Sequence, residues 1–157
     1  MSAHVYSEIY LHANWHTDQN APILTPEVEP FVRNYIRNRC KATGGVYFEE
    51  CNGTETHVHL VVRIEPQITI SNFLGELKGG CSFEANKHFN RKFLYWQRGF
   101  GVVSFNKKTL PWIVEYVRKQ KEHHANGGKG IASLEQTECQ EMAKALASRL
   151  KAGSWVG

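Results

Sequence analysis

The sequence lacks any pair of cysteines at the short spacing that zinc sites and redox motifs use. Its four cysteines (Cys40, Cys51, Cys81 and Cys139) lie in unrelated segments, so neither a zinc knuckle nor a disulfide framework is predicted. The chain also has no apolar stretch approaching the roughly 18 residues that a membrane span requires, and no basic-then-apolar signal at its N-terminus. We therefore expect a soluble, cytoplasmic protein with reduced thiols and no membrane contact.

The sequence has no large excess of either positive or negative charge. The 19 Lys and Arg residues against 15 Asp and Glu give a formal net charge of +4, which favours a polyanionic partner without requiring one. Aromatic residues, by contrast, are plentiful, with eight Phe, six Tyr and four Trp, and aromatic side chains beside basic ones can stack on single-stranded nucleic acid. At 157 residues the chain has the length of one domain, so we expect most of these rings to lie in its core.

Hydrophobic periodicity predicts an alternation of strands and helices. Strands are predicted at 5–15, 45–50, 57–64 and 99–105, and helices at 26–43, 70–89 and 109–124. Thr25 is predicted to cap the first helix, with Pro26 at its first position. The Asn-Gly pair at 52–53 predicts the turn of a hairpin between the second and third strands.

This order of elements is that of the split βαβ, ferredoxin-like α+β domain. It predicts an antiparallel sheet with helices on one face, leaving the other face free for function, and a further helix after the last strand. We assign residues 1–126 to this domain and residues 127–157 to a linker and a helical tail. In the tail, Ser133 and Gln136 form a capping box for an amphipathic helix with Leu134, Met142, Leu146 and Leu150 on one face.

Two histidines one residue apart, His57 and His59, stand at the head of the apolar run HVHLVVRI. Side chains alternate across a strand, so both imidazoles project from one face, roughly 6–7 Å apart along the strand. In that position they can bind one metal ion. A short pattern of this kind also occurs as a pair of surface or hydrogen-bonded histidines, and that alternative stays open.

The helix predicted at 109–124 offers a third ligand. Tyr116 and Gln120 are neighbours at i and i+4 on one flank, which Trp112 and His123 share. If the amide oxygen of Gln120 reached a metal ion, the phenol of Tyr116 would be held beside it. The simpler reading is that Tyr116 is an ordinary aromatic at the boundary of the core.

Taken together, these motifs resemble the single-tyrosine HUH transposases of the smallest, IS200-like bacterial insertion sequences, including the REP-associated tyrosine transposases. The resemblance depends on HVH with its aliphatic run, on YWQRGFGVVSF, and on YVRKQKEHH. The segments YLHANWHTDQNAPIL and ELKGGCSFEANK are similar as well. The resemblance therefore covers about residues 5–125. The chain after residue 126 matches no ending of the family.

The resemblance implies that His57, His59 and Gln120 are metal ligands and that Tyr116 is the nucleophile. Members of the family act as homodimers on single-stranded DNA with imperfect hairpins, and they cut it through a covalent 5′-phosphotyrosine bond that leaves a free 3′-hydroxyl. A neutral ligand set of two His and one Gln suits Mg²⁺ or Mn²⁺.

Candidate DNA contacts are Trp15, Arg98, Arg118 and Lys119. Burial in the core is an equal alternative for Trp15. For Arg118 and Lys119, on the tyrosine helix, the equal alternative is a solvated basic face without a DNA contact. Two other functions stay open: a domesticated REP-type nuclease that acts on host palindromes, and a non-catalytic single-stranded nucleic-acid-binding module. The sequence disfavours a third, a rolling-circle initiator or relaxase, because such proteins usually carry further domains and nothing here is left over for a helicase. The sequence does not decide whether the tyrosine helix serves its own subunit or a partner.

Overall fold

The computed structural model describes residues 4–125 and 132–137 of the chain. Its centre is a four-stranded sheet whose strands lie in the order β2-β3-β1-β4, and every neighbouring pair is antiparallel. The strands are β1 (Ile9–His16), β2 (Val46–Gly53), β3 (His57–Ile64) and β4 (Gly101–Phe105). This is the predicted ferredoxin-like α+β topology.

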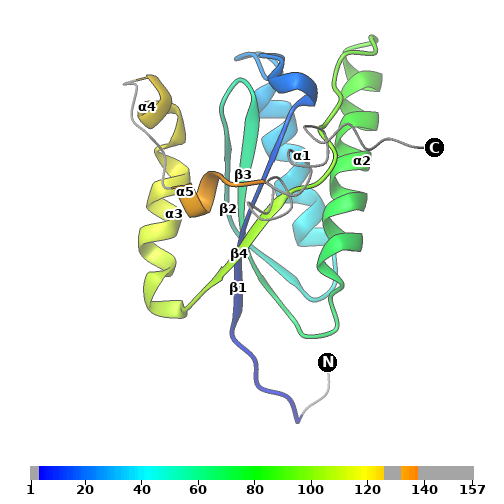
Figure 1. Cartoon of the computed structure of the whole chain (residues 1–157). Helices are drawn as coiled ribbons and strands as arrows, with labels where there is room; N and C mark the ends of the chain where they lie inside the picture. Colours follow the sequence, from blue (N-terminus) through cyan, green and yellow to red (C-terminus); the bar gives the residue numbers. More distant parts are fainter. Residues whose placement is uncertain (1–3, 126–131, 138–157) are drawn as a thin grey trace, which may run out of the picture.

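Helices cover both faces of the sheet (Figure 1). Helices α1 (Glu29–Ala42) and α2 (Ile70–His88) lie on one face, and α3 (Leu110–Arg118) lies on the other. Short helices α4 (Gln120–Ala125) and α5 (Ala132–Glu135) follow, and 3-10 turns occupy Asp18–Asn20 (η1) and Lys107–Thr109 (η2). The second face of the sheet is therefore not open along its whole length, because α3 and α5 pack on it.

The side chains of β3 divide between two apolar cores. Val58, Leu60 and Val62 belong to the main core beneath α1 and α2. Val61 belongs to a smaller cluster on the opposite face, completed by residues of α3 and α5: Ile113, Tyr116, Val117 and Leu134. Since residues two apart share a face of a strand, His57 and His59 lie on the same side as Val61, facing α3 and α5.

Two predicted boundaries are wrong. The first helix begins at Glu29 and not at Pro26, with Pro30 in its first turn, although Thr25 still accepts the amide of Val28 through its hydroxyl at 3.3 Å. The Asn52-Gly53 pair lies inside β2 and is not the hairpin turn. Strand β2 runs on to Gly53, with a register shift between Phe48 and Glu50, so the turn is formed by residues 54–56.

The helix predicted at 109–124 is two helices. It breaks at Lys119, whose φ and ψ are −93° and 10°, so Tyr116 lies in the last turn of α3 and Gln120 begins α4. The carbonyls that the break releases accept hydrogen bonds from Asn52: its side-chain amide lies 3.1 Å from the oxygen of Val117 and 3.0 Å from that of Arg118. A buried side chain of β2 thus ends the tyrosine helix.

Other predictions of the fold have varied outcomes. Helix α2 runs unbroken through Gly79 and Gly80, as predicted. The predicted start of the tail helix is wrong: α5 begins at Ala132, before the predicted cap Ser133, and ends at Glu135, so Gln136 lies outside it. Met142, Leu146, Leu150 and Cys139 lie outside the described residues, and so does the boundary proposed at residue 126. Within the described part of the chain, no helix is both long and apolar enough to cross a membrane.

Candidate metal and tyrosine site

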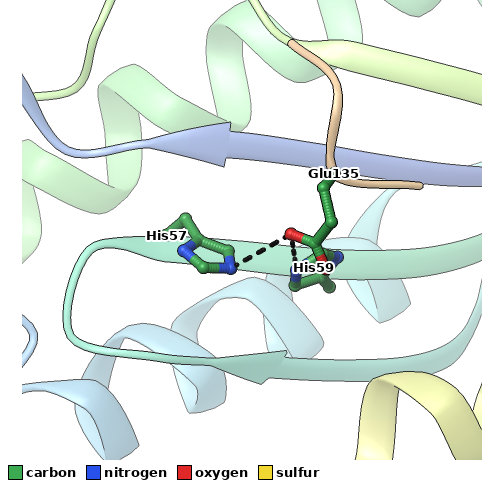
Figure 2. A group of neighbouring side chains, drawn as sticks. All are labelled: His57, His59 and Glu135. Carbon is green, nitrogen blue, oxygen red and sulfur yellow. Dashed lines mark ion pairs between the residues drawn. The ribbon is translucent and has the colours of Figure 1, made fainter. Parts of the chain in front are cut away.

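The two strand histidines meet a carboxylate from the tail. The Oε2 atom of Glu135 lies 3.4 Å from Nε2 of His57 and 3.3 Å from Nε2 of His59. Figure 2 shows the three side chains, with both imidazoles on β3 and Glu135 reaching toward them. Both histidines are buried, while the Glu135 side chain keeps 20% of its surface exposed. The cluster lies on the face of the sheet that also carries α3.

Each imidazole is also contacted at its other ring nitrogen. Nδ1 of His59 lies 2.9 Å from Nε2 of His12 on β1, and Nδ1 of His57 lies 2.9 Å and 3.0 Å from the hydroxyls of Thr54 and Thr56. Contacts of this kind fix the ring orientation and tautomer of metal-ligating histidines, because the nitrogen turned away from the metal is occupied. His12 therefore orients a candidate ligand, and burial together with the neighbouring His59 lowers the pKa of His12 to about 3.

The hydroxyl of Tyr116 completes the group. It donates a hydrogen bond of 2.6 Å to Oε1 of Glu135. Its ring packs edge-on against His59, with centroids 6.2 Å apart, and stacks between Trp112 and His123 at 5.8 Å and 5.5 Å. Trp112, Tyr116 and His123 therefore lie on one flank, as predicted. Within one chain, the tyrosine lies beside that chain's own His59.

Opposing effects act on the carboxyl of Glu135. Burial disfavours its ionised form, but hydrogen bonds from His57 and His59, the charge of His59 and the Tyr116 hydroxyl outweigh that effect and lower the pKa of Glu135 well below its usual range. Glu135 is accordingly a carboxylate at neutral pH. It supplies a negative charge between two imidazoles and a phenol.

Gln120, the third ligand that the sequence resemblance implied, is fully buried at the start of α4. The break at Lys119 separates the helix of Tyr116 from the helix of Gln120, so the two residues do not share one continuous helix as predicted. The oxygen-bearing side chain that the structure brings to the histidines is Glu135, which sequence reasoning missed. Its only signal was its position within a predicted helix cap, and nothing in its spacing links it to β3.

The four candidate DNA contacts differ in their surroundings. For Trp15 the structure bears out the alternative of core burial: its ring is fully buried in the main core, edge-on to Trp96 with centroids 6.0 Å apart, and has no exposed face on which a base could stack. Arg98 is exposed. Arg118 and Lys119 are more than half exposed and pair with Glu115 at 3.5 Å and 3.3 Å, so their charges are partly neutralised.

An antiparallel ferredoxin-like sheet that presents two strand histidines to a tyrosine on a following helix defines the class of single-tyrosine HUH proteins. The family model described as "Transposase IS200 like" matches residues 5–120. The chain therefore belongs to the IS200-like transposase family.

Curated relatives agree with this assignment. The transposases for insertion sequence element IS200 of Salmonella typhimurium and Salmonella typhi are each 34% identical to the chain over 102 residues. The match covers 61% of this chain and only 66% of the length of those relatives.

Two solved structures share the fold. A candidate transposase from Deinococcus radiodurans R1 superimposes with a TM-score of 0.61 at 20% identity, over 77% of this chain and 97% of that one. A REP-associated tyrosine transposase bound to a REP hairpin superimposes with a TM-score of 0.55 at 15% identity, over 100% of this chain and 92% of that one.

Proposed function

We propose that the chain is a metal-dependent transposase that nicks and rejoins single-stranded DNA at hairpin-marked ends, with Tyr116 as the nucleophile. The observation that carries this proposal is the carboxylate of Glu135, which contacts both strand histidines through one oxygen and the Tyr116 hydroxyl through the other. A hydroxyl nucleophile and two imidazole ligands are thereby gathered around one group, in a chain of the IS200-like transposase family.

His57, His59 and Gln120 are the proposed metal ligands, and the surroundings of the histidines fit that role. The nitrogen of each ring that faces away from Glu135 already has a partner in His12 or in the threonines of the hairpin turn. A bound Mg²⁺ or Mn²⁺ would neutralise charge on a phosphate oxygen as the bond to phosphorus changes.

The reaction proposed for Tyr116 is a reversible transesterification. The tyrosine oxygen forms a bond to phosphorus, the bond from phosphorus to the 3′-oxygen breaks, and the phenolic proton is balanced by the proton gained by the departing 3′-oxygen. The products are a 5′-phosphotyrosine and a free 3′-hydroxyl. A phenol is both a usable nucleophile and a fair leaving group, so the same step can run backwards and rejoin DNA.

The proposed partner is single-stranded DNA that carries imperfect hairpins, bound by a homodimer. Arg98, Arg118 and Lys119 supply exposed positive charge for phosphate contacts. Support for a hairpin ligand comes from the solved neighbour that superimposes on the whole chain, since that protein is a REP-associated tyrosine transposase bound to a REP hairpin.

The same neighbour supports a second candidate function, a domesticated REP-type nuclease that cleaves host palindromes. Both functions use the same site and chemistry. They differ in the DNA that is cut: the ends of a mobile element in one case, dispersed host repeats in the other. A non-catalytic nucleic-acid-binding module is less well supported, because the central strand β3 presents histidines where such sheets present stacking aromatics.

Formation of a covalent adduct tests the proposal. The full chain is incubated with Mn²⁺ and single-stranded DNA carrying candidate hairpins, and an adduct that survives denaturing gel electrophoresis is expected for the wild type and not for Tyr116→Phe. Tyr95→Phe is the matched control, because it removes the same oxygen from an exposed ring outside the site. An adduct on Tyr116→Phe, or one mapped by peptide mass to another tyrosine, would refute the assignment.

A further inference from the structure

The two distances from the carboxylate of Glu135 to the histidines are those of ligands around one metal ion. First-row divalent ions and Mg²⁺ hold imidazole nitrogen and carboxylate oxygen at about 2.0–2.2 Å, so two ligands at a right or tetrahedral angle lie roughly 2.8–3.6 Å apart. The distances from Oε2 of Glu135 to Nε2 of His57 and of His59 are 3.4 Å and 3.3 Å. One potential ligand atom from each of the three residues lies within 4.8 Å of the others.

We infer that Glu135, carried by the segment after the tyrosine helix, is a ligand of the same metal ion that His57 and His59 hold. This inference rests on the proposed function, since it concerns the metal of that site. It makes the described part of the tail a component of the metal centre, and it adds a carboxylate to the neutral ligand set that the family resemblance implied.

The structure anchors Glu135 from both sides. Leu134, the residue before it, is 5% exposed and packs in the cluster with Val61 and Val117. The buried side-chain amide of Asn14 on β1 donates to the carbonyl of Leu134 at 2.8 Å and to that of Gln136 at 3.2 Å. These contacts fix the backbone on either side of Glu135, so its carboxylate is held over the histidines by packing as well as by charge.

Strand β4 also leaves room for this segment. A Cβ atom at Gly101 would collide with the backbone carbonyl of Gln136. That oxygen belongs to main chain that Asn14 holds in place, so it cannot move aside as the end of a flexible side chain would. The observed path of residues 134–136 therefore requires glycine at position 101. A larger residue there would displace Glu135, although none of the proposed ligand side chains is itself replaced.

The added carboxylate changes what the site binds. Hard oxygen ligands favour Mg²⁺ and Mn²⁺ over softer ions, and a negative charge strengthens the hold on any divalent cation. The other oxygen of Glu135 accepts the hydrogen bond of Tyr116, so one carboxylate joins the metal position to the nucleophile. Glu135 thereby also positions the hydroxyl beside the metal.

A competing account makes Glu135 only a counter-ion that occupies the metal position in the metal-free protein. The two accounts predict opposite changes in metal affinity. Removing a ligand weakens binding of the ion, whereas removing a competing counter-ion strengthens it.

Binding of Mn²⁺ to the full chain tests the inference by calorimetry, without DNA and without turnover. We expect one Mn²⁺ per chain for the wild type and an affinity at least about 10-fold lower for Glu135→Gln, which keeps the shape of the side chain but loses its charge and replaces one acceptor oxygen by a donor amide. Gly101→Ala is expected to weaken binding in the same direction. Glu115→Gln is the matched control, because it removes one charge beside Tyr116 from a side chain that contacts Arg118 and Lys119 and not the histidines, and its affinity is expected to stay within about two-fold.

Water-proton relaxation supplies a second measurement. With saturating Mn²⁺, Glu135→Ala is expected to show one more bound water than the wild type, since a water takes the place of the lost ligand. Circular dichroism in EDTA verifies that each variant is folded.

Equal or tighter Mn²⁺ binding by Glu135→Gln, together with loss of binding by His57→Ala, would overturn this inference and leave the proposed histidine site intact. Absence of Mn²⁺ binding by the wild type would overturn the inference and the metal-dependent function together.

Discussion

Asn52 is predicted to be the residue that ends the tyrosine helix, and its replacement should cost stability. Its side-chain amide donates to the carbonyls of Val117 and Arg118, and its side-chain oxygen accepts from Lys121 at 3.1 Å. A net hydrogen bond contributes about 1 kcal/mol, and leaving a buried carbonyl without a donor costs about 1–3 kcal/mol. Since Asn52 is only 6% exposed, water cannot readily replace it. We expect Asn52→Ala to lower the free energy of unfolding by about 2 kcal/mol, or ~4–8 °C in Tm for a chain of this size.

Urea denaturation followed by tryptophan fluorescence measures the change. Asn34→Ala is the matched control: the same amide is removed from an exposed position on α1, where its oxygen accepts a hydrogen bond from Arg37. We expect its stability to stay within about 0.5 kcal/mol of the wild type. Asn52→Asp is expected to destabilise as well, because a carboxylate cannot donate to the two carbonyls. If Asn52→Ala and Asn34→Ala were equally stable, the account of why the helix breaks at Lys119 would be wrong.

Three further predictions follow from the site and the fold. His57→Ala and His59→Ala should each abolish Mn²⁺-dependent nicking while the far-ultraviolet circular dichroism stays that of the wild type, and undiminished cutting by either variant would end the metal hypothesis. The protein should sediment as a dimer, as the proposed function expects; an active monomer at tens of micromolar would contradict this. Burial raises the pKa of the thiols of Cys40 and Cys81 to about 12, so neither should react with a thiol reagent at pH 8 until the protein unfolds, and rapid native labelling of either would refute their placement in the core.

The periodic parts of the chain were predictable from the sequence because their pattern reports which face of an element is buried. The alternation along HVHLVVRI predicted that His57 and His59 share a face of β3, and the structure places Val58, Leu60 and Val62 in the core on the opposite side. The apolar spacing from Ile70 likewise predicted α2 through both of its glycines. Such patterns are local, so a single sequence carries them in full.

What required the tertiary structure depends on contacts between distant segments. The sequence pattern ran a single helix through Lys119, but the fold breaks it there, because Asn52 of β2 supplies the hydrogen bonds that another helical turn would have supplied. From sequence alone, a tryptophan beside basic and polar residues is equally consistent with a DNA contact and with burial in the core. Only the packing against Trp96 shows that Trp15 is buried in the core.

The site shows the same division. The sequence by itself determined the candidate histidines and the tyrosine: spacing within one strand and one helix made them candidates, and the family resemblance implied their roles. The third group around them, Glu135, was decided by the fold alone, because a short segment reaches the histidines only through the packing of Leu134 and the hydrogen bonds of Asn14. Spacing along a chain reports geometry within an element, whereas the meeting of β1, β3, α3 and α5 at one carboxylate depends on how the elements pack together.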